Sequence, residues 1–232
     1  MEQLVFELAA PEAPCLANFL PGRNAELVAV LPAFIAGQHN ATGMLLWGAP
    51  ASGKSHLLAA AVALARERGL AAQYVAQPRE LADDLGGADA LIAIDRVEEA
   101  DAAAAGRMFT LFNALQQRSG RMIAATRAPL ATLPLREDLR TRLGWGLVYE
   151  VFALADEDKS MALGAYAKER GFALSGEVID YLLRHGRRDM RSLLATLAAL
   201  DRRSLATKRP ITVPMIKEWL QQELEWERRT NG

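Results

Sequence analysis

The segment GAPASGKS, residues 48–55, constrains the fold more than any other stretch of the chain. It matches the phosphate-loop pattern G-x-x-x-x-G-K-[ST] at every defined position. The apolar run from Met44 to Trp47 precedes it and predicts a buried strand, whereas the apolar residues after it follow helical spacing up to Gly69. A strand, a glycine-rich loop and a helix in this order are the context that the pattern requires, so we expect a phosphate-binding loop in an α/β domain.

Strand and helix patterns continue to alternate after this loop up to about residue 153. The predicted strands after the first cover residues 71–75, 90–95, 121–126 and 146–154, and the predicted helices between them cover residues 78–85 and 101–120. Alternation of this kind is typical of a parallel sheet with helices packed on both faces. We therefore predict an α/β fold with a parallel, five-stranded P-loop sheet covered by helices on both sides.

The pattern changes after residue 153, where only helical periodicity follows. The predicted helices cover residues 156–171, 175–186, 188–208 and 212–229, and Ser175 is a good N-cap for the second of them. We predict three parts: a terminal peptide and linker over 1–20, an α/β nucleotide-binding domain over 21–153, and a small all-helical domain over 154–232.

Each position of the phosphate loop has a chemical task. Glycines let backbone N–H groups turn inward around a phosphate, and the N-terminus of the following helix adds positive potential. Lys54 reaches the β- and γ-phosphates and Ser55 offers its hydroxyl to Mg²⁺. Asp95, at the end of the predicted strand LIAID, is expected to hold the metal through water. The predicted nucleotide-binding residues are Gly48, Ala49, Pro50, Ala51, Ser52, Gly53, Lys54, Ser55 and Asp95, of which Ser55 and Asp95 serve the magnesium.

The residue after Asp95 departs from the pattern of a fast ATPase. Many ATPases of this architecture have a glutamate there to polarise the attacking water, but this chain has Arg96, and its nearest acids are Glu98 and Glu99. Two interpretations of Glu98 stay open: it faces the site as a catalytic group, or it is a solvated acid in the first turn of the next helix. We therefore expect weak or absent ATP hydrolysis by this chain alone.

Composition argues against several other classes of function. The net charge of −1 does not favour bulk attraction to nucleic acid or to an acidic membrane. One cysteine, Cys15, excludes an internal disulfide, and the three histidines lack the spacing of zinc ligands. The N-terminus has no signal-peptide pattern, and no apolar run reaches membrane-spanning length. We expect a soluble, cytoplasmic protein in a reducing compartment.

Taken with the phosphate loop and LIAID, several further segments make the chain resemble the AAA+ ATPases of the DnaA initiator group. These segments look like the adenine-side segment, the arginine-finger box, the second sensor helix and the end of the lid of that family. They are NFLPGRN (18–24), DLRTRLGWG (138–146), RRDMRSLLATLAALDR (187–202) and ITVPMIKEWL (211–220). The resemblance covers essentially all of the chain, and it implies that the helical domain is a nucleotide lid.

The resemblance also implies roles for three residues outside the loop. Thr126 would be the first sensor, near the γ-phosphate, and Arg191 would reach back to the phosphates of the chain's own nucleotide, which is ADP or ATP with Mg²⁺. Arg142 looks like an arginine finger, which acts in trans on the nucleotide of a neighbouring molecule. A guanidinium suits both arginine roles, because its planar fork spreads charge over phosphoryl oxygens. The alternative for each arginine is a surface ion pair.

The segment QLVFEL near the N-terminus has two interpretations. In regulatory members of the DnaA group a similar peptide docks on the replicative sliding clamp, the beta subunit of DNA polymerase III, and the docking residues here would be Gln3, Leu4, Phe6 and Leu8. The proline-rich stretch behind it would act as a tether. Its alternating pattern also fits an edge strand, and two copies of it can pair, so a homo-oligomer is among the expected states.

The resemblance implies a regulator of replication initiation. Such a protein binds adenine nucleotide, docks on the DNA-loaded clamp, and promotes hydrolysis of the ATP bound to DnaA, which inactivates the initiator. It would meet DNA only through the clamp, because the chain ends at Gly232 without room for a DNA-reading domain, and it would be associated with the bacterial nucleoid. The alternatives are a self-hydrolysing AAA+ loader that acts on a helicase or on DNA and, less well supported, a P-loop kinase of small molecules.

Overall fold

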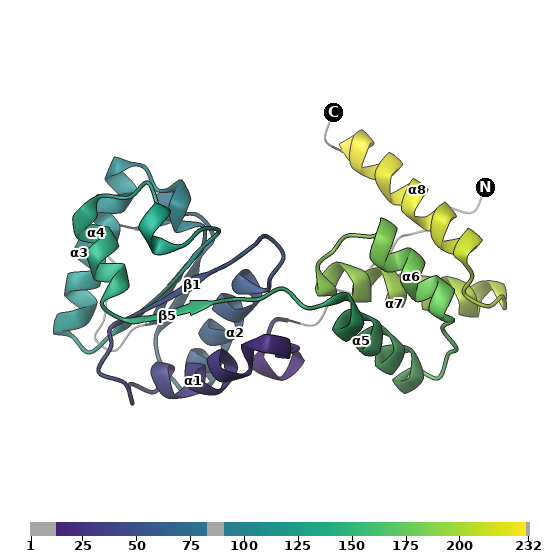
Figure 1. The fold of residues 1–232 in the computed structure, drawn as a ribbon, viewed down its shortest axis with the longest axis horizontal. Coiled ribbons are helices and arrows are strands. Elements are labelled where there is room, and N and C mark those ends of the chain that lie inside the picture. The colour runs from purple at the N-terminus through teal and green to yellow at the C-terminus, as the bar shows by residue number, and fades with distance from the viewer. Residues whose placement is uncertain (1–12, 83–90, 231–232) are drawn as a thin grey trace. The chain divides into compact units, whose positions relative to one another are not determined.

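The computed structural model describes residues 13–82 and 91–230 of the chain. Two compact units are present, and the division falls between Ala153 and Leu154. The first unit contains an α/β layer structure and the second contains only helices (Figure 1). Each unit is described by itself below.

A parallel sheet forms the centre of the first unit. Its strands are β1 (Gly43–Trp47), β2 (Ala72–Val75), β3 (Leu91–Ile94), β4 (Arg121–Thr126) and β5 (Leu147–Glu150). Their order is β2-β3-β4-β1-β5, and every neighbouring pair is parallel. The predicted five-stranded parallel sheet is confirmed, although β5 is shorter than the predicted strand over 146–154. The carboxyl ends of β1, β3 and β4 meet at one edge, and this edge positions the site.

Helices cover both faces of the sheet, as predicted. Helices α1 (Ala25–Ile35) and α2 (Lys54–Glu67) pack on one face, and α3 (Ala102–Gln117) and α4 (Glu137–Gly144) pack on the other (Figure 1). The strands divide their side chains between two separate cores, because successive residues of a strand point to opposite faces. In β1, for example, Leu45 belongs to the α3 side. Its neighbours Met44 and Leu46 belong to the α2 side.

Short 3-10 turns join several of these elements. They cover Leu16–Asn18, Gly22–Asn24, Pro78–Glu80, Val97–Glu99 and Leu130–Thr132. The helix predicted over 78–85 is wrong at its start, where the structure has only the turn Pro78–Glu80. Residues 83–85 of that prediction lie outside the described residues. After the turn at Pro78–Glu80 the chain becomes extended at Leu81, because that side chain is buried in the core on the α3 side.

The second unit is a helical domain with its own core. Its helices are α5 (Asp156–Glu169), α6 (Gly176–His185), α7 (Met190–Thr207) and α8 (Val213–Thr230), in agreement with the predicted helices. Ser175 caps α6 and Asp189 caps α7, since each side chain accepts a hydrogen bond from a backbone N–H of the first turn. Apolar side chains from all four helices form one buried cluster. Across the described part of the chain, no helix has both the length and the apolarity to cross a membrane.

Candidate nucleotide-binding site

The phosphate loop connects β1 to α2 and needs glycine at two positions. Gly48 has φ of 156°, and a Cβ atom there would lie 2.4 Å from the carbonyl oxygen of Val151. Gly53 has φ of 102°, and a Cβ atom there would lie 2.7 Å from the ring of Phe19. Both backbone conformations are ones that side-chain-bearing residues rarely adopt. The loop therefore turns tightly onto the N-terminus of α2, whose free N–H groups and dipole favour an anion.

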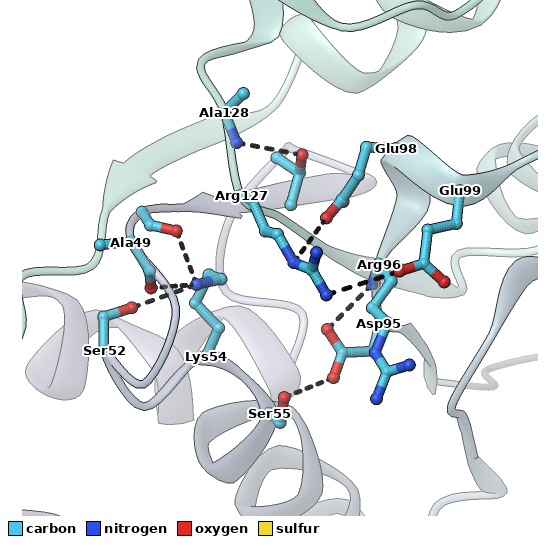
Figure 2. A network of polar contacts seen from close by, with 12 residues as sticks. Ala49, Ser52, Lys54, Ser55, Asp95, Arg96, Glu98, Glu99, Arg127 and Ala128 are labelled. Atoms are coloured by element: carbon cyan, nitrogen blue, oxygen red, sulfur yellow. Dashed lines mark hydrogen bonds and ion pairs between the residues drawn. The ribbon is translucent and has the colours of Figure 1, made fainter. Parts of the chain in front are cut away.

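Lys54 holds a positive charge inside this loop. The residue is only 8% exposed, and its Nζ donates hydrogen bonds to the carbonyl oxygens of Gly48 and Ala49, each at 2.7 Å, and to Oγ of Ser52 at 3.2 Å (Figure 2). Burial lowers the pKa of Lys54, and the negative charges of Asp95 and Glu98 oppose this shift. The loop thus fixes the ammonium group at its centre, where the negative charges of Asp95 and Glu98 act on it.

Asp95 is the acidic partner of the loop. It lies directly after β3, is 4% exposed, and accepts hydrogen bonds from Oγ of Ser55 at 2.5 Å and from the backbone N–H of Arg96 at 2.9 Å (Figure 2). Ser55 and Asp95 are 40 residues apart in the chain. The fold therefore brings together the two side chains that the sequence assigned to magnesium.

Tyr74, on β2, is a further contact of Asp95. Its hydroxyl donates a hydrogen bond to Oδ2 of Asp95 at 3.0 Å, the same oxygen that Ser55 contacts. Burial raises the pKa of Tyr74 to about 12, and the charge of Asp95 adds to the shift. The hydroxyl consequently remains a donor at every physiological pH and orients the carboxylate.

The Tyr74→Phe variant is expected to lose this orientation. Removal of one hydrogen bond to a charged acceptor should cost up to about 1.5 kcal/mol at pH 7. Because the folded-state pKa is raised, the stabilisation is fully present below pH 10, the ordinary tyrosine value, and is lost as pH rises towards 12. Urea unfolding of both proteins at pH 7 and at pH 11 should show the difference shrinking at the higher pH. A difference that did not depend on pH would contradict the assignment.

Two further polar residues belong to the strand ends beside the loop: Thr126 ends β4, and Glu98 lies in the turn after β3. Thr126 is 1% exposed, and its hydroxyl accepts a hydrogen bond from the N–H of Ala128 at 3.4 Å. Glu98 lies in the turn Val97–Glu99 before α3, and both of its carboxylate oxygens are shielded from solvent. Nε of Arg127 lies 3.4 Å from Oε1 of Glu98 (Figure 2). Glu98 is therefore not a solvated acid, and its negative charge acts on Lys54.

Two predicted arginines belong to other elements than the loop and the strand ends around it. Arg142 is on α4, in the layer opposite α2, and its guanidinium stacks 4.1 Å from the ring centre of Trp145 and 5.7 Å from that of Phe109. Its described partners are aromatic rings rather than a carboxylate. Arg191 is exposed in the first turn of α7, in the helical unit. The predicted docking residues Gln3, Leu4, Phe6 and Leu8 lie outside the described residues.

Sequence reasoning missed two polar residues of the site, Tyr74 and Arg127. Both lie where a strand approaches its carboxyl end, since Tyr74 precedes the last residue of β2 and Arg127 follows the last residue of β4. In open α/β sheets this edge holds the ligand-binding groups. A search for polar residues at every predicted strand end would have found both.

Comparisons with known proteins agree with this architecture. Residues 156–220 match the family model described as "Hda, lid domain". This segment of the helical unit is thus similar to an Hda lid domain. The expected resemblance to Hda-like, DnaA-homologous proteins is thereby confirmed. The matched segment contains α5, α6, α7 and the first part of α8.

Solved structures show the same fold at low sequence identity. Domain III of the Thermotoga maritima initiator DnaA is 17% identical, with a TM-score of 0.72, over 90% of the present chain and 95% of the domain. AMPPCP-bound DnaA from Aquifex aeolicus is 21% identical, with a TM-score of 0.65, over 81% of the present chain and 65% of the DnaA chain. A Thermotoga maritima RuvB variant is 14% identical, with a TM-score of 0.67, over 90% and 71% of the two chains. The chain thus spans less than two thirds of the Aquifex initiator.

Proposed function

We propose that this protein binds an adenine nucleotide and regulates replication initiation by acting on DnaA. The observation that supports the proposal is that one chain combines a match to the Hda lid model with a complete phosphate-loop site. The related initiator from Aquifex aeolicus binds AMPPCP with the same fold. The residues of the present loop fit such a ligand, because the loop conformation excludes side chains at Gly48 and Gly53 while Lys54 supplies positive charge.

The residues that would hold the nucleotide follow from the geometry of the loop. Backbone N–H groups over 48–53 and the start of α2 would bind the phosphates together with Lys54. Ser55 and Asp95 would hold Mg²⁺, whose contribution is to neutralise phosphate charge. We assign Thr126 to the first-sensor position and Arg191 to contact with the nucleotide from the lid. The nucleotide, ADP or ATP, then serves mainly to order the lid and the surface that contacts DnaA.

The regulatory step that we propose uses Arg142 as an arginine finger. Its guanidinium would enter the site of a DnaA molecule and stabilise the charge that develops when DnaA hydrolyses its own ATP. Stacking on Trp145 and Phe109 restricts the side chain and so reduces the entropy lost on insertion. Hydrolysis by the chain itself would be weak, because Arg96 occupies the position of the usual glutamate and Glu98 is shielded from solvent.

Clamp docking by residues 3–8 can be tested on its own. We expect the double substitution Gln3→Ala, Leu4→Ala to weaken clamp binding at least tenfold, since burial of one leucine contributes roughly 2 kcal/mol. Surface plasmon resonance with immobilised clamp measures the change, and Glu7→Ala, at a position outside the docking pattern, is the matched control. Undiminished binding by the double variant would support the edge-strand interpretation instead.

The proposed activity is tested with ATP-loaded DnaA, sliding clamp and DNA. Addition of the protein should convert DnaA-bound ATP to ADP, and omission of the clamp should abolish the effect. The competing function, a self-hydrolysing loader, predicts turnover of free ATP that DNA or a helicase stimulates without any clamp. Measurement of basal ATP turnover in the same buffer separates the two functions.

A further inference from the structure

Arg127 places an exposed guanidinium beside the phosphate loop. It follows Thr126, the last residue of β4, whose carbonyl oxygen accepts a hydrogen bond from the N–H of Gly48 at 3.2 Å. The register of the sheet pairs Thr126 with Trp47, the residue before the loop. Arg127 therefore follows the end of β4 at the same level of the sheet at which the phosphate loop follows the end of β1. Its side chain is 57% exposed, so it is accessible to a ligand.

The guanidinium contacts two carboxylates only loosely. Nε of Arg127 lies 3.4 Å from Oε1 of Glu98, and Nη2 lies 3.5 Å from Oε1 of Glu99 (Figure 2). Charge-assisted hydrogen bonds of good geometry are about 2.7–2.9 Å long. Within the described residues, neither carboxylate oxygen of Glu98 accepts a hydrogen bond. These ion pairs therefore leave the donors of Arg127 available for a better acceptor.

Glu98, Arg127 and Lys54 share one electrostatic environment. The charge of Glu98 opposes the effect of burial on the pKa of Lys54, whereas the charge of Arg127 lowers that pKa further. Glu98 is also the more buried partner of Arg127, with its side chain 16% exposed against 39% for Glu99. A further negative group near Lys54 would compete with Glu98 for both cations, because charges attract strongly where water is scarce.

We propose that Arg127 reads the γ-phosphate of a nucleotide held in this chain's own loop. The inference rests on the proposed nucleotide site. With a triphosphate, Arg127 exchanges Glu98 and Glu99 for phosphoryl oxygens, which match the planar fork of its donors. With a diphosphate this acceptor is missing, and Arg127 keeps its carboxylates. Arg127 is thus a specificity-determining residue that distinguishes triphosphate from diphosphate, and Glu98 is the group that competes with the ligand.

Nucleotide affinities of the full chain test this exchange without any activity measurement. Isothermal titration calorimetry with ADP and with AMPPCP, each with Mg²⁺, gives the preference between the two ligands. Arg127→Ala should weaken AMPPCP about tenfold, the scale of one lost charge-assisted contact, and change ADP less than twofold. Glu98→Gln removes the competing charge and should shift the preference in the opposite direction, towards AMPPCP.

A matched control and two outcomes complete the test. Arg136→Ala removes an arginine of similar exposure, 59%, that pairs with Asp138, and it should leave both affinities unchanged. Equal weakening of both ligands by Arg127→Ala, or an unchanged preference in both Arg127→Ala and Glu98→Gln, overturns the inference while the nucleotide site stands. Failure of the parent protein to bind either ligand instead removes the proposed function itself. Circular dichroism confirms that each variant is folded.

Discussion

An Arg142→Ala variant is expected to lose nearly all stimulation of DnaA-bound ATP hydrolysis. An arginine finger contributes a factor of about a thousand or more to phosphoryl transfer, because it neutralises charge that appears only in the transition state. Single-turnover measurement of ADP formed on DnaA, with clamp and DNA present, gives the rate. The variant should still bind its own nucleotide, because the described contacts of Arg142 are with Trp145 and Phe109, and none is with the residues that contact Lys54.

The shape of the guanidinium can be separated from its charge. Arg142→Lys keeps a positive charge but loses the planar fork and the stacking on Trp145, so we expect it to recover only a small part of the activity. Arg140→Ala, on the same helix, removes an arginine outside the proposed finger position and is the matched control. Full activity of Arg142→Ala alongside an inactive Arg140→Ala would move the finger to the neighbouring residue. Full activity of both variants would remove the finger from α4.

The phosphate loop and the sheet could be predicted because their signals are local. Residues 48–55 are contiguous, and at Gly48 and Gly53 the backbone has conformations that residues with side chains rarely adopt. Buried parallel strands are short apolar runs, so β1, β3 and β4 were visible without any knowledge of their neighbours. Asp95 followed from the same reasoning, because it ends one such run.

Other features depend on contacts between distant segments. Helix α1 contains Pro32 and helix α4 carries several charged residues in eight positions, so neither shows a clean helical pattern, and both are stabilised by packing on the sheet. The segment after Pro78 stops being helical because Leu81 fills the core. Tyr74 meets Asp95 only because β2 pairs with β3, and strand order cannot be read from the spacing of residues.

The Lys54→Ala variant is expected to lose at least about a hundredfold in affinity for adenine nucleotide, because hydrogen bonds to charged groups contribute about 1.5–3 kcal/mol each and Lys54 would supply more than one to the phosphates. Two effects act in the same direction. The substitution removes the positive charge from the loop, and it removes the donor that holds the carbonyl groups of Gly48 and Ala49. Calorimetry with ADP measures the loss, and Lys168→Ala, an exposed lysine on α5, is the control.

The same variant tests whether the bound nucleotide has a structural task. Lys54→Ala leaves Arg142 and residues 3–8 unchanged. The variant therefore keeps the proposed arginine finger and the proposed clamp-docking peptide, and it loses only the bound nucleotide. If the nucleotide orders the lid and the interface, stimulation of DnaA should fall together with nucleotide occupancy and recover at high ADP concentration, because ligand binding restores the competent state by mass action. Stimulation that persists without nucleotide would show that the finger acts from a surface that is already ordered.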